Sequence, residues 1–148
     1  MTCTKNIKIV IIICILFLSI GLVACSTKED VSSNEVIFYN PNIVVANDDI
    51  VNITFSGKQK LGDIVGYMCS IENKSKNNIT VYTKDTSLYD KKVELDLSYD
   101  IESNTKLNAL MCVFDIESLK DLGDTKGIIC IETENSNEEI KEYSFELD

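Results

Sequence analysis

Three residue types are missing from this chain: it contains no histidine, no tryptophan and no arginine, and Pro41 is its only proline. Without histidine, neither a Ser-His-Asp triad nor a Cys-His pair can form. Zinc would have to be bound by cysteines and carboxylates alone, and the chain has no Cys-x-x-Cys pair. Composition therefore argues against an enzyme built on these sites, and it indicates no catalytic residue, metal or cofactor.

Positive charge is also scarce, because 14 lysines face 24 acidic residues and give a net charge of −10. Binding to phosphate backbones requires clustered lysine and arginine, so nucleic acid is excluded as a partner. Attraction to anionic lipid is disfavoured for the same reason. The acidic surface is typical of a domain that stays in solution next to a membrane.

The amino-terminal 24 residues have the order of a secretory signal. Lys5 and Lys8 provide positive charge, and residues 9–20 are almost entirely apolar. This run is shorter than the about 20 apolar residues of a membrane-spanning helix. It ends at Leu22-Val23-Ala24-Cys25, and a polar stretch follows. We expect a hydrophobic signal helix at this end of the chain.

The four residues 22–25 resemble the lipobox of bacterial lipoproteins. The resemblance implies that Leu22, Val23 and Ala24 are recognised by a signal peptidase that cuts before Cys25. It also implies that the thiol of Cys25 carries a diacylglyceryl anchor. Two acyl chains hold a protein on a bilayer stably. The expected product is a lipoprotein on the extracytoplasmic face of the cell membrane.

Processing at this site would divide the chain into three parts. Residues 1–24 are the signal peptide, residues 25–35 a flexible polar tether, and residues 36–148 one domain. Removing the 24 leader residues, with Lys5 and Lys8, from the 148-residue chain leaves 124 residues and a net charge of −12.

Three cysteines, Cys69, Cys112 and Cys130, lie in the domain. An odd number leaves several states open: one disulfide with a free thiol, or three reduced thiols. Cys69 and Cys130 have the wide separation of an immunoglobulin disulfide. However, Ile128 stands where such domains have a tyrosine, and no tryptophan is present to pack on the bridge. We favour the interpretation that all three cysteines are small apolar residues of the core.

Alternation of apolar and polar residues predicts about eight short strands. Val51, Ile53 and Phe55 should share one face. Turn residues separate the runs, and Pro41 is expected at a turn or an edge-strand break. Two short apolar pieces cover residues 36–39 and 43–46, the longer predicted strands cover residues 50–56, 64–72, 79–83, 93–100, 107–114, 127–132 and 140–147, and turns are expected at 57–60, 85–90 and 135–137.

One helical turn interrupts this pattern. Asp115 is a candidate N-cap for residues 116–122, and Gly123 suits the position after the last turn. The last two predicted strands should form a hairpin. Together, the predicted strands and turns indicate an all-β chain folded as an antiparallel β-sandwich.

Four stretches of the chain resemble a family of uncharacterised immunoglobulin-like domains in lipoproteins of Gram-positive bacteria. They are VNITFSG (51–57), IENKS (71–75), NITV (78–81) and residues 119–131. The resemblance covers residues 49–147. It implies an immunoglobulin-like sandwich outside the cytoplasm, and it implies no catalytic residues.

Acidic pairs offer the remaining candidate chemistry, namely Asp48 with Asp49, Asp121 with Asp124, and Glu132 with Glu134. A calcium site needs six or more oxygen ligands, and no pair fits a known calcium loop. Solvated acidic loops are the simpler interpretation. Five of the six tyrosines either form an aromatic binding face or take part in ordinary sheet packing; they are Tyr67, Tyr82, Tyr89, Tyr99 and Tyr143.

Two functions from different classes follow. The first is a non-enzymatic binding or structural module on the outer face of the membrane, which meets a protein partner through a sheet edge. The second is a small carboxylate-based hydrolase or a metal-dependent sensor. A contiguous apolar patch on the surface would favour the first, and a deep pocket with converging carboxylates would favour the second.

Overall fold

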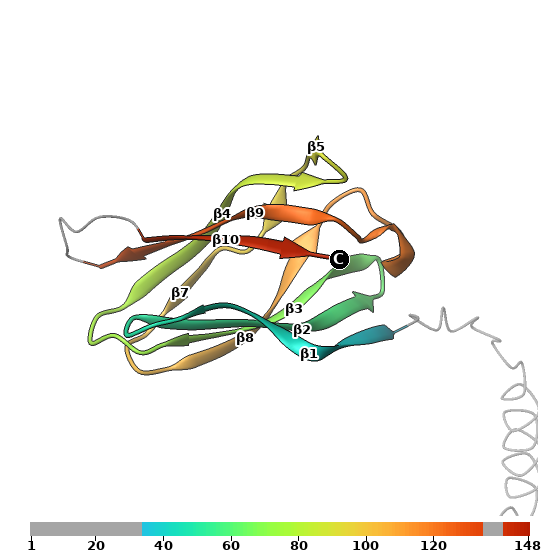
Figure 1. Ribbon diagram of the computed structural model, residues 1–148. Helices are drawn as coiled ribbons and strands as arrows, with labels where there is room; N and C mark the ends of the chain where they lie inside the picture. The colour runs from blue at the N-terminus through green and yellow to red at the C-terminus, as the bar shows by residue number, and fades with distance from the viewer. Residues whose placement is uncertain (1–33, 135–140) are drawn as a thin grey trace, which may run out of the picture. The chain divides into compact units, whose positions relative to one another are not determined.

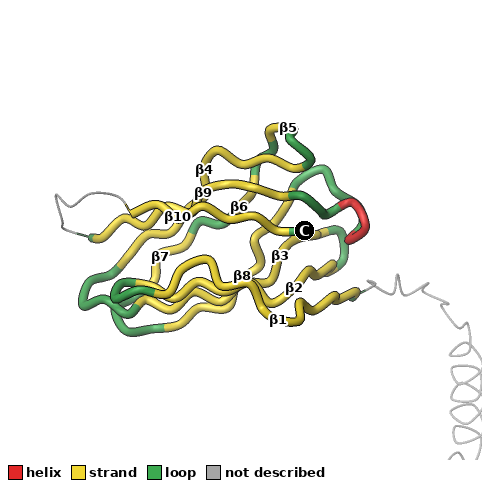
Figure 2. The backbone as a smooth tube through the Cα atoms, viewed as in Figure 1, coloured by secondary structure: helices red, strands yellow, loops and turns green. Residues whose placement is uncertain are grey.

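The structure is a computed structural model that describes residues 34–134 and 141–148. The described chain forms two antiparallel sheets that lie one over the other (Figure 1). The signal helix, the processing site and the turn at 135–137 lie outside the described residues. The all-β sandwich expected from the alternation is confirmed, and the one helical element of the described residues is a single 3-10 turn (Figure 2).

Each sheet has five strands. Sheet A runs in the order β1 (Glu35–Asn47), β2 (Val51–Leu61), β3 (Ile64–Asn73), β8 (Lys106–Val113), β6 (Leu95–Asp96). Sheet B runs in the order β10 (Lys141–Leu147), β9 (Thr125–Thr133), β4 (Ile79–Leu88), β5 (Lys91–Lys92), and β7 (Tyr99–Ile101) also pairs with β4. The hairpin of the last two strands is confirmed by the pairing of β10 with β9.

The core consists of the inward faces of the two sheets. Val51, Ile53 and Phe55 of β2 are fully buried, as their alternation predicted. Phe55 contacts Tyr67 of the same sheet edge-to-face at 6.4 Å between ring centroids and reaches Phe145 of sheet B at 6.0 Å. Each buried side chain of this size contributes roughly 1.5–3 kcal/mol, so these facing rows hold the sheets together.

The first two strands are longer than predicted. The two short pieces on either side of Pro41 form one edge strand, β1, with a cis Asn40–Pro41 bond and a register shift between Phe38 and Ile43. The turn expected at 57–60 is wrong, because β2 continues through a bulge at Gly57 to Leu61. A Cβ at Gly57 would lie 2.0 Å from the carbonyl oxygen of Ile37. Only glycine permits β1 and β2 to pair there.

The segment 93–100 is not the single strand that its alternation predicted. Leu95 and Asp96 pair with β8 in sheet A, whereas residues from Tyr99 onward pair with β4 in sheet B. Leu95 and Leu97 are buried as expected, but Tyr99 is exposed and Ile101 is buried instead. The alternation cannot reveal this switch between sheets, because both parts of the segment face the same core.

Asp115 is not the N-cap of a helix. Its φ of 59° is left-handed, and the 3-10 turn η1 (Leu119–Asp121) begins after Ser118, whose side chain accepts a hydrogen bond from the Lys120 N–H. Leu119 and Leu122 are nevertheless buried. The predicted loop at 85–90 is also mostly strand, because β4 continues to Leu88.

A buried amide ties the β3–β4 turn to the rest of the sandwich. Asn73 has no exposed surface, and its Nδ2 donates to the carbonyl oxygens of Asn77, Ile101 and Glu102 at 2.9–3.1 Å. Its Oδ1 accepts hydrogen bonds from the N–H and the hydroxyl of Ser75. The stretch IENKS is therefore the polar link between this turn and the β7–β8 loop.

We expect Asn73→Ala to lower the free energy of unfolding by about 2–4 kcal/mol, because it leaves buried carbonyls without a donor. Asn108→Ala, at an exposed position on β8, should change it by less than about 0.5 kcal/mol. Urea denaturation of both variants measures the difference. Equal stability of the two variants would contradict this role of Asn73.

Candidate functional site

The four edges of the two sheets differ in how they are protected. β6 and β5 are two residues long, and β7 has three. β10 presents exposed Glu142 and Glu146, which form ion pairs with Lys84 and Lys126 of sheet B. Short strands and charges are the usual devices against edge-to-edge pairing. Within the described chain, β1 is the edge where these devices are weakest.

The first half of β1 is apolar and exposed. Phe38 is 74% exposed and Ile37 44%, and Val36 beside them is exposed as well. β1 pairs with β2 alone, so its other side is the outer edge of sheet A. Pro41 lacks an N–H and interrupts the register with β2. Residues 35–39 therefore form an open edge of five residues.

This edge is continuous with an apolar area on the outer face of sheet A. The strand register aligns Phe38, Gly57, Met68 and Leu110 in one row across four strands, and the next row is Val36, Gln59, Gly66 and Cys112. Met68, Leu110 and Cys112 are all partly exposed. At the other end of the same face the row is polar, with Asn47, Asn52, Glu72 and Lys106. We call residues 36–38, Met68, Leu110 and Cys112 the edge patch.

Further apolar residues are exposed at the same end of sheet A. Leu61 and Ile64 lie on either side of the β2–β3 turn, and Phe114 follows β8. β1 begins at this end, β2 and β8 end there, and β3 starts there. Of the nine large apolar side chains exposed on the described residues, six are therefore gathered here. Single exposed apolar residues are ordinary, whereas a contiguous group marks an interaction surface.

The sequence contained a signal for this site that alternation does not detect. Residues 36–39 are four consecutive apolar residues, and a strand with one solvated face would alternate there. Met68 and Leu110 are also apolar positions on outward faces. Which of these residues lie side by side depends on the strand order, so the patch emerges only in the folded sheet.

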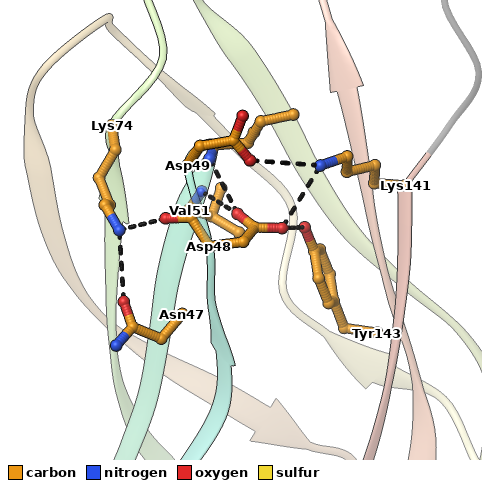
Figure 3. A network of polar contacts seen from close by, with 8 residues as sticks. Asn47, Asp48, Asp49, Val51, Lys74, Lys141 and Tyr143 are labelled. Atoms are coloured by element: carbon orange, nitrogen blue, oxygen red, sulfur yellow. Dashed lines mark hydrogen bonds and ion pairs between the residues drawn. The ribbon is translucent and has the colours of Figure 1, made fainter.

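The acidic pair Asp48 and Asp49 lies in a network that connects the two sheets (Figure 3). Oδ1 of Asp48 accepts hydrogen bonds from the N–H groups of Ile50 and Val51, and Oδ2 accepts one from the Tyr143 hydroxyl at 2.6 Å. Lys141 forms ion pairs with both carboxylates. The β1–β2 turn is thereby fixed to β10, which is a structural role.

This network changes the acidity of Asp48. Burial alone would raise its pKa, but the hydrogen bonds from Tyr143, Val51 and Ile50, with the charge of Lys141, hold the pKa well below its usual value. The folded state therefore binds the proton less readily than the unfolded chain. The contribution of the Asp48 carboxylate to the free energy of unfolding is therefore fully present above the ordinary carboxyl pKa of about 3.9. It is lost as the pH falls below that value.

We expect Asp48→Asn to lower the free energy of unfolding by roughly 1–2 kcal/mol at pH 7, a range reduced because the carboxylate is one-third exposed. The difference from the unsubstituted protein should shrink as the pH falls below about 4. Urea denaturation at pH 7 and pH 3 measures it. A difference that is the same at both pH values would contradict the assignment.

The other acidic pairs are spread over the surface. Asp124 forms an ion pair with Lys126 at 2.8 Å, while Asp121 belongs to η1. Glu132 accepts a hydrogen bond from Tyr82, and Glu134 accepts one from Asn78. Glu132 and Glu134 line one hollow with Asp100 and Glu102. Over residues 34–134 and 141–148, no group of three or more cysteine or acidic residues has the arrangement of a metal site.

The five tyrosines do not form one aromatic face. Tyr67 is in the core and shares a hydrogen bond with Thr125 at 2.6 Å, and burial raises its pKa to about 12. Tyr82 donates to Glu132 at an exposed position on sheet B, and Tyr143, which packs against the core, donates to Asp48 of the β1–β2 turn. The remaining two, Tyr89 and Tyr99, are exposed at separate positions. Ordinary sheet packing accounts for this distribution.

The three domain cysteines are free thiols, but the expectation that all three are core residues is wrong for Cys112, which is only partly buried. Cys69 is in the core, where burial raises its pKa to about 12. Cys130 has no exposed surface, although it lies outside the core cluster, opposite Tyr82 and Glu142 in the register of sheet B. Cys112 is partly exposed in the edge patch. Burial raises the pKa of both of these thiols.

We expect iodoacetamide to modify Cys112 faster than Cys69 or Cys130 in the folded protein, because reaction requires an accessible thiolate. All three should react once the protein is unfolded in urea. Mass spectrometry of peptides from the unreduced protein measures both results. A thiol that stays unmodified after unfolding, and that becomes reactive only after reduction, would show a disulfide and contradict the free state.

Comparison with known proteins identifies no relative of this chain. No family model, no curated protein and no solved structure matches the chain. Among the described residues no helix is both long and apolar enough to cross a membrane. Leu22, Val23, Ala24 and Cys25 lie outside the described residues, so the processing site stays a prediction from the sequence.

Proposed function

We propose that this protein is a lipid-anchored, extracytoplasmic lipoprotein whose domain binds a protein partner through the open edge of β1. The single observation that supports binding is the exposed run 36–38 on an edge strand that lacks the protection of the other three edges. The anchor rests on Lys5, Lys8, the apolar run 9–20 and the lipobox that ends at Cys25. The function is non-enzymatic binding, with no cofactor.

The domain is proposed to be immunoglobulin-like. Two antiparallel five-stranded sheets enclose one core, and the chain passes between them several times, as from β3 to β4 and from β8 to β9. The tryptophan and the inter-sheet disulfide of antibody domains are replaced here by Phe55, Tyr67 and Phe145, whose rings span the two sheets.

Binding at the open edge would proceed by strand addition. A five-residue strand spans about 17 Å, and an added strand hydrogen-bonds to the free N–H and C=O groups of the edge. Each such bond contributes a net of about 0.5–1.5 kcal/mol. The apolar outer face at the edge adds specificity for a partner with apolar side chains, because these would cover Phe38.

Two substitutions test the anchor. We expect Cys25→Ala to abolish incorporation of labelled fatty acid and to leave the leader uncleaved, because the thiol is the acyl acceptor. Cys112→Ala should leave both unchanged, since that thiol lies in the domain. Fatty-acid labelling and the mass of the product measure the outcome, and a labelled Cys25→Ala variant would exclude this anchor.

Photocrosslinking in intact membranes tests the edge. A photoreactive phenylalanine analogue at position 38 should yield protein adducts, because this side chain is 74% exposed on the open edge. The same analogue at Asn108, exposed at the polar end of sheet A, is the matched control and should give few. Equal adduct yields at the two positions would rule out the edge as the binding surface.

A further inference from the structure

We propose that the open edge of β1 pairs with β1 of a second copy of this chain, antiparallel and about a two-fold axis at Ile37. This rests on the proposed function, because it assigns an occupant to the same edge. The pairing would join sheet A of the two copies into one continuous sheet of ten strands. A two-fold contact requires one surface to complement itself, and the run 35–39 meets that condition.

The register follows from which side chains share a face. Directly opposite residues of an antiparallel pair lie on the same face. Centring on Ile37 places Val36 opposite Phe38 of the second copy, both on the outer face, and Glu35 opposite Tyr39. A shift by one residue would oppose outward and inward side chains. A shift by two in one direction would place Asn40, next to Pro41, in the pairing, and a shift by two in the other would place Asn34 there, so only the Ile37 register pairs all of residues 35–39 with one another.

The outer face supports the same arrangement. Because Phe38 ends the apolar row of sheet A and Val36 ends the next row, which also contains Gln59, their pairing would bring the edge patches of both copies together. Each patch alone exposes Phe38 at 74%. In the pair, Phe38 would pack against Val36 of the second copy. Aromatic and β-branched residues are favourable neighbours across strands.

The length of the tether permits both copies to share one membrane. The ten residue steps from Cys25 to Glu35 reach at most about 35 Å. In an antiparallel pair the two Glu35 residues lie only about four strand residues apart, roughly 14 Å. Both lipids can therefore enter the same bilayer. Anchoring in one surface also raises the effective concentration of a second copy.

The charges at this edge do not oppose pairing strongly, although the chain is acidic overall. Glu35 is the only charged residue among 35–39, and Lys58 and Lys60 lie on the neighbouring strand β2. Pro41 in turn confines the pairing to this segment, because residues 40 and 41 break the edge. The contact is thus closed at two copies and does not extend along the strand.

Disulfide trapping tests the register in the full-length protein in its membrane. Residues 37 of the two copies would have Cα atoms about 4.5–5.5 Å apart, which is within the range of a disulfide. We expect Ile37→Cys to give a covalent dimer on mild oxidation. Val44→Cys is the matched control, since it is an exposed aliphatic position on the same strand beyond Pro41, and it should remain monomeric, as should the unsubstituted chain.

A charge substitution tests the pair without added thiols. In detergent-solubilised full-length protein, sedimentation should show a dimer. Phe38→Lys should raise the dissociation constant of this dimer about tenfold or more, since each lysine would face Val36 across the axis. Val44→Lys should leave it unchanged. A monomeric full-length protein with no Ile37→Cys disulfide overturns the proposal.

The photocrosslinking result separates this inference from the proposed function. Adducts at position 38 with twice the mass of the chain support self-pairing. Adducts with a different polypeptide overturn self-pairing and leave the edge as the binding surface. Adducts with lipid alone, or the absence of adducts, overturn both.

Discussion

The contact of Phe55 with Tyr67 and Phe145 is the constraint on which the sandwich depends. These three rings come from β2, β3 and β10: the ring centroids of Phe55 and Tyr67 lie 6.4 Å apart within sheet A, and those of Phe55 and Phe145 lie 6.0 Å apart across the two sheets. Tyr67 also reaches Thr125 of β9 with its hydroxyl, so the same residue provides apolar contact and a buried hydrogen bond. Such aromatic pairs contribute about 0.5–1.5 kcal/mol beyond their buried area. They set which faces of β2 and β3 turn inward.

The inward orientation of these rings determines which side chains lie on the outer face of sheet A. Once Tyr67 and Met111 point into the core, their neighbours Met68 and Leu110 must point outward, because side chains alternate along a strand. Phe38 enters the same row through its pairing with Gly57, where no side chain separates β1 from β2. The apolar surface beside the edge is therefore a consequence of the core register together with one glycine.

An unprotected edge is a liability that soluble domains normally avoid. Here three edges are short or charged, and the fourth carries Val36, Ile37 and Phe38 in its first half only. Pro41 and the two flanking asparagines limit the exposed run to a defined length. This combination distinguishes a bounded open edge from a strand that would polymerise, and the proposed membrane anchor would further restrict how copies meet.

Much of the fold was predictable because it depends on local alternation. The inward faces of β2 and β3 and the β9–β10 hairpin follow from period-2 patterns and turn residues, and Val51, Ile53 and Phe55 show this directly. The helix proposed after Asp115 and the single strand at 93–100 failed. In these two segments the spacing of apolar residues indicates which side chains are buried. It does not indicate which helix, turn or strand carries them.

By itself, the sequence determined the β class of the domain, its acidic charge and the absence of histidine chemistry, because these depend on composition and on short-range patterns, and it predicts a leader and a lipobox ahead of the domain. Only the tertiary structure decided that Phe38, Met68 and Leu110 lie in one row and that β1 is an open edge. Those residues are distant in the chain, and only the pairing order of the strands, a property of long-range hydrogen bonding, brings them together.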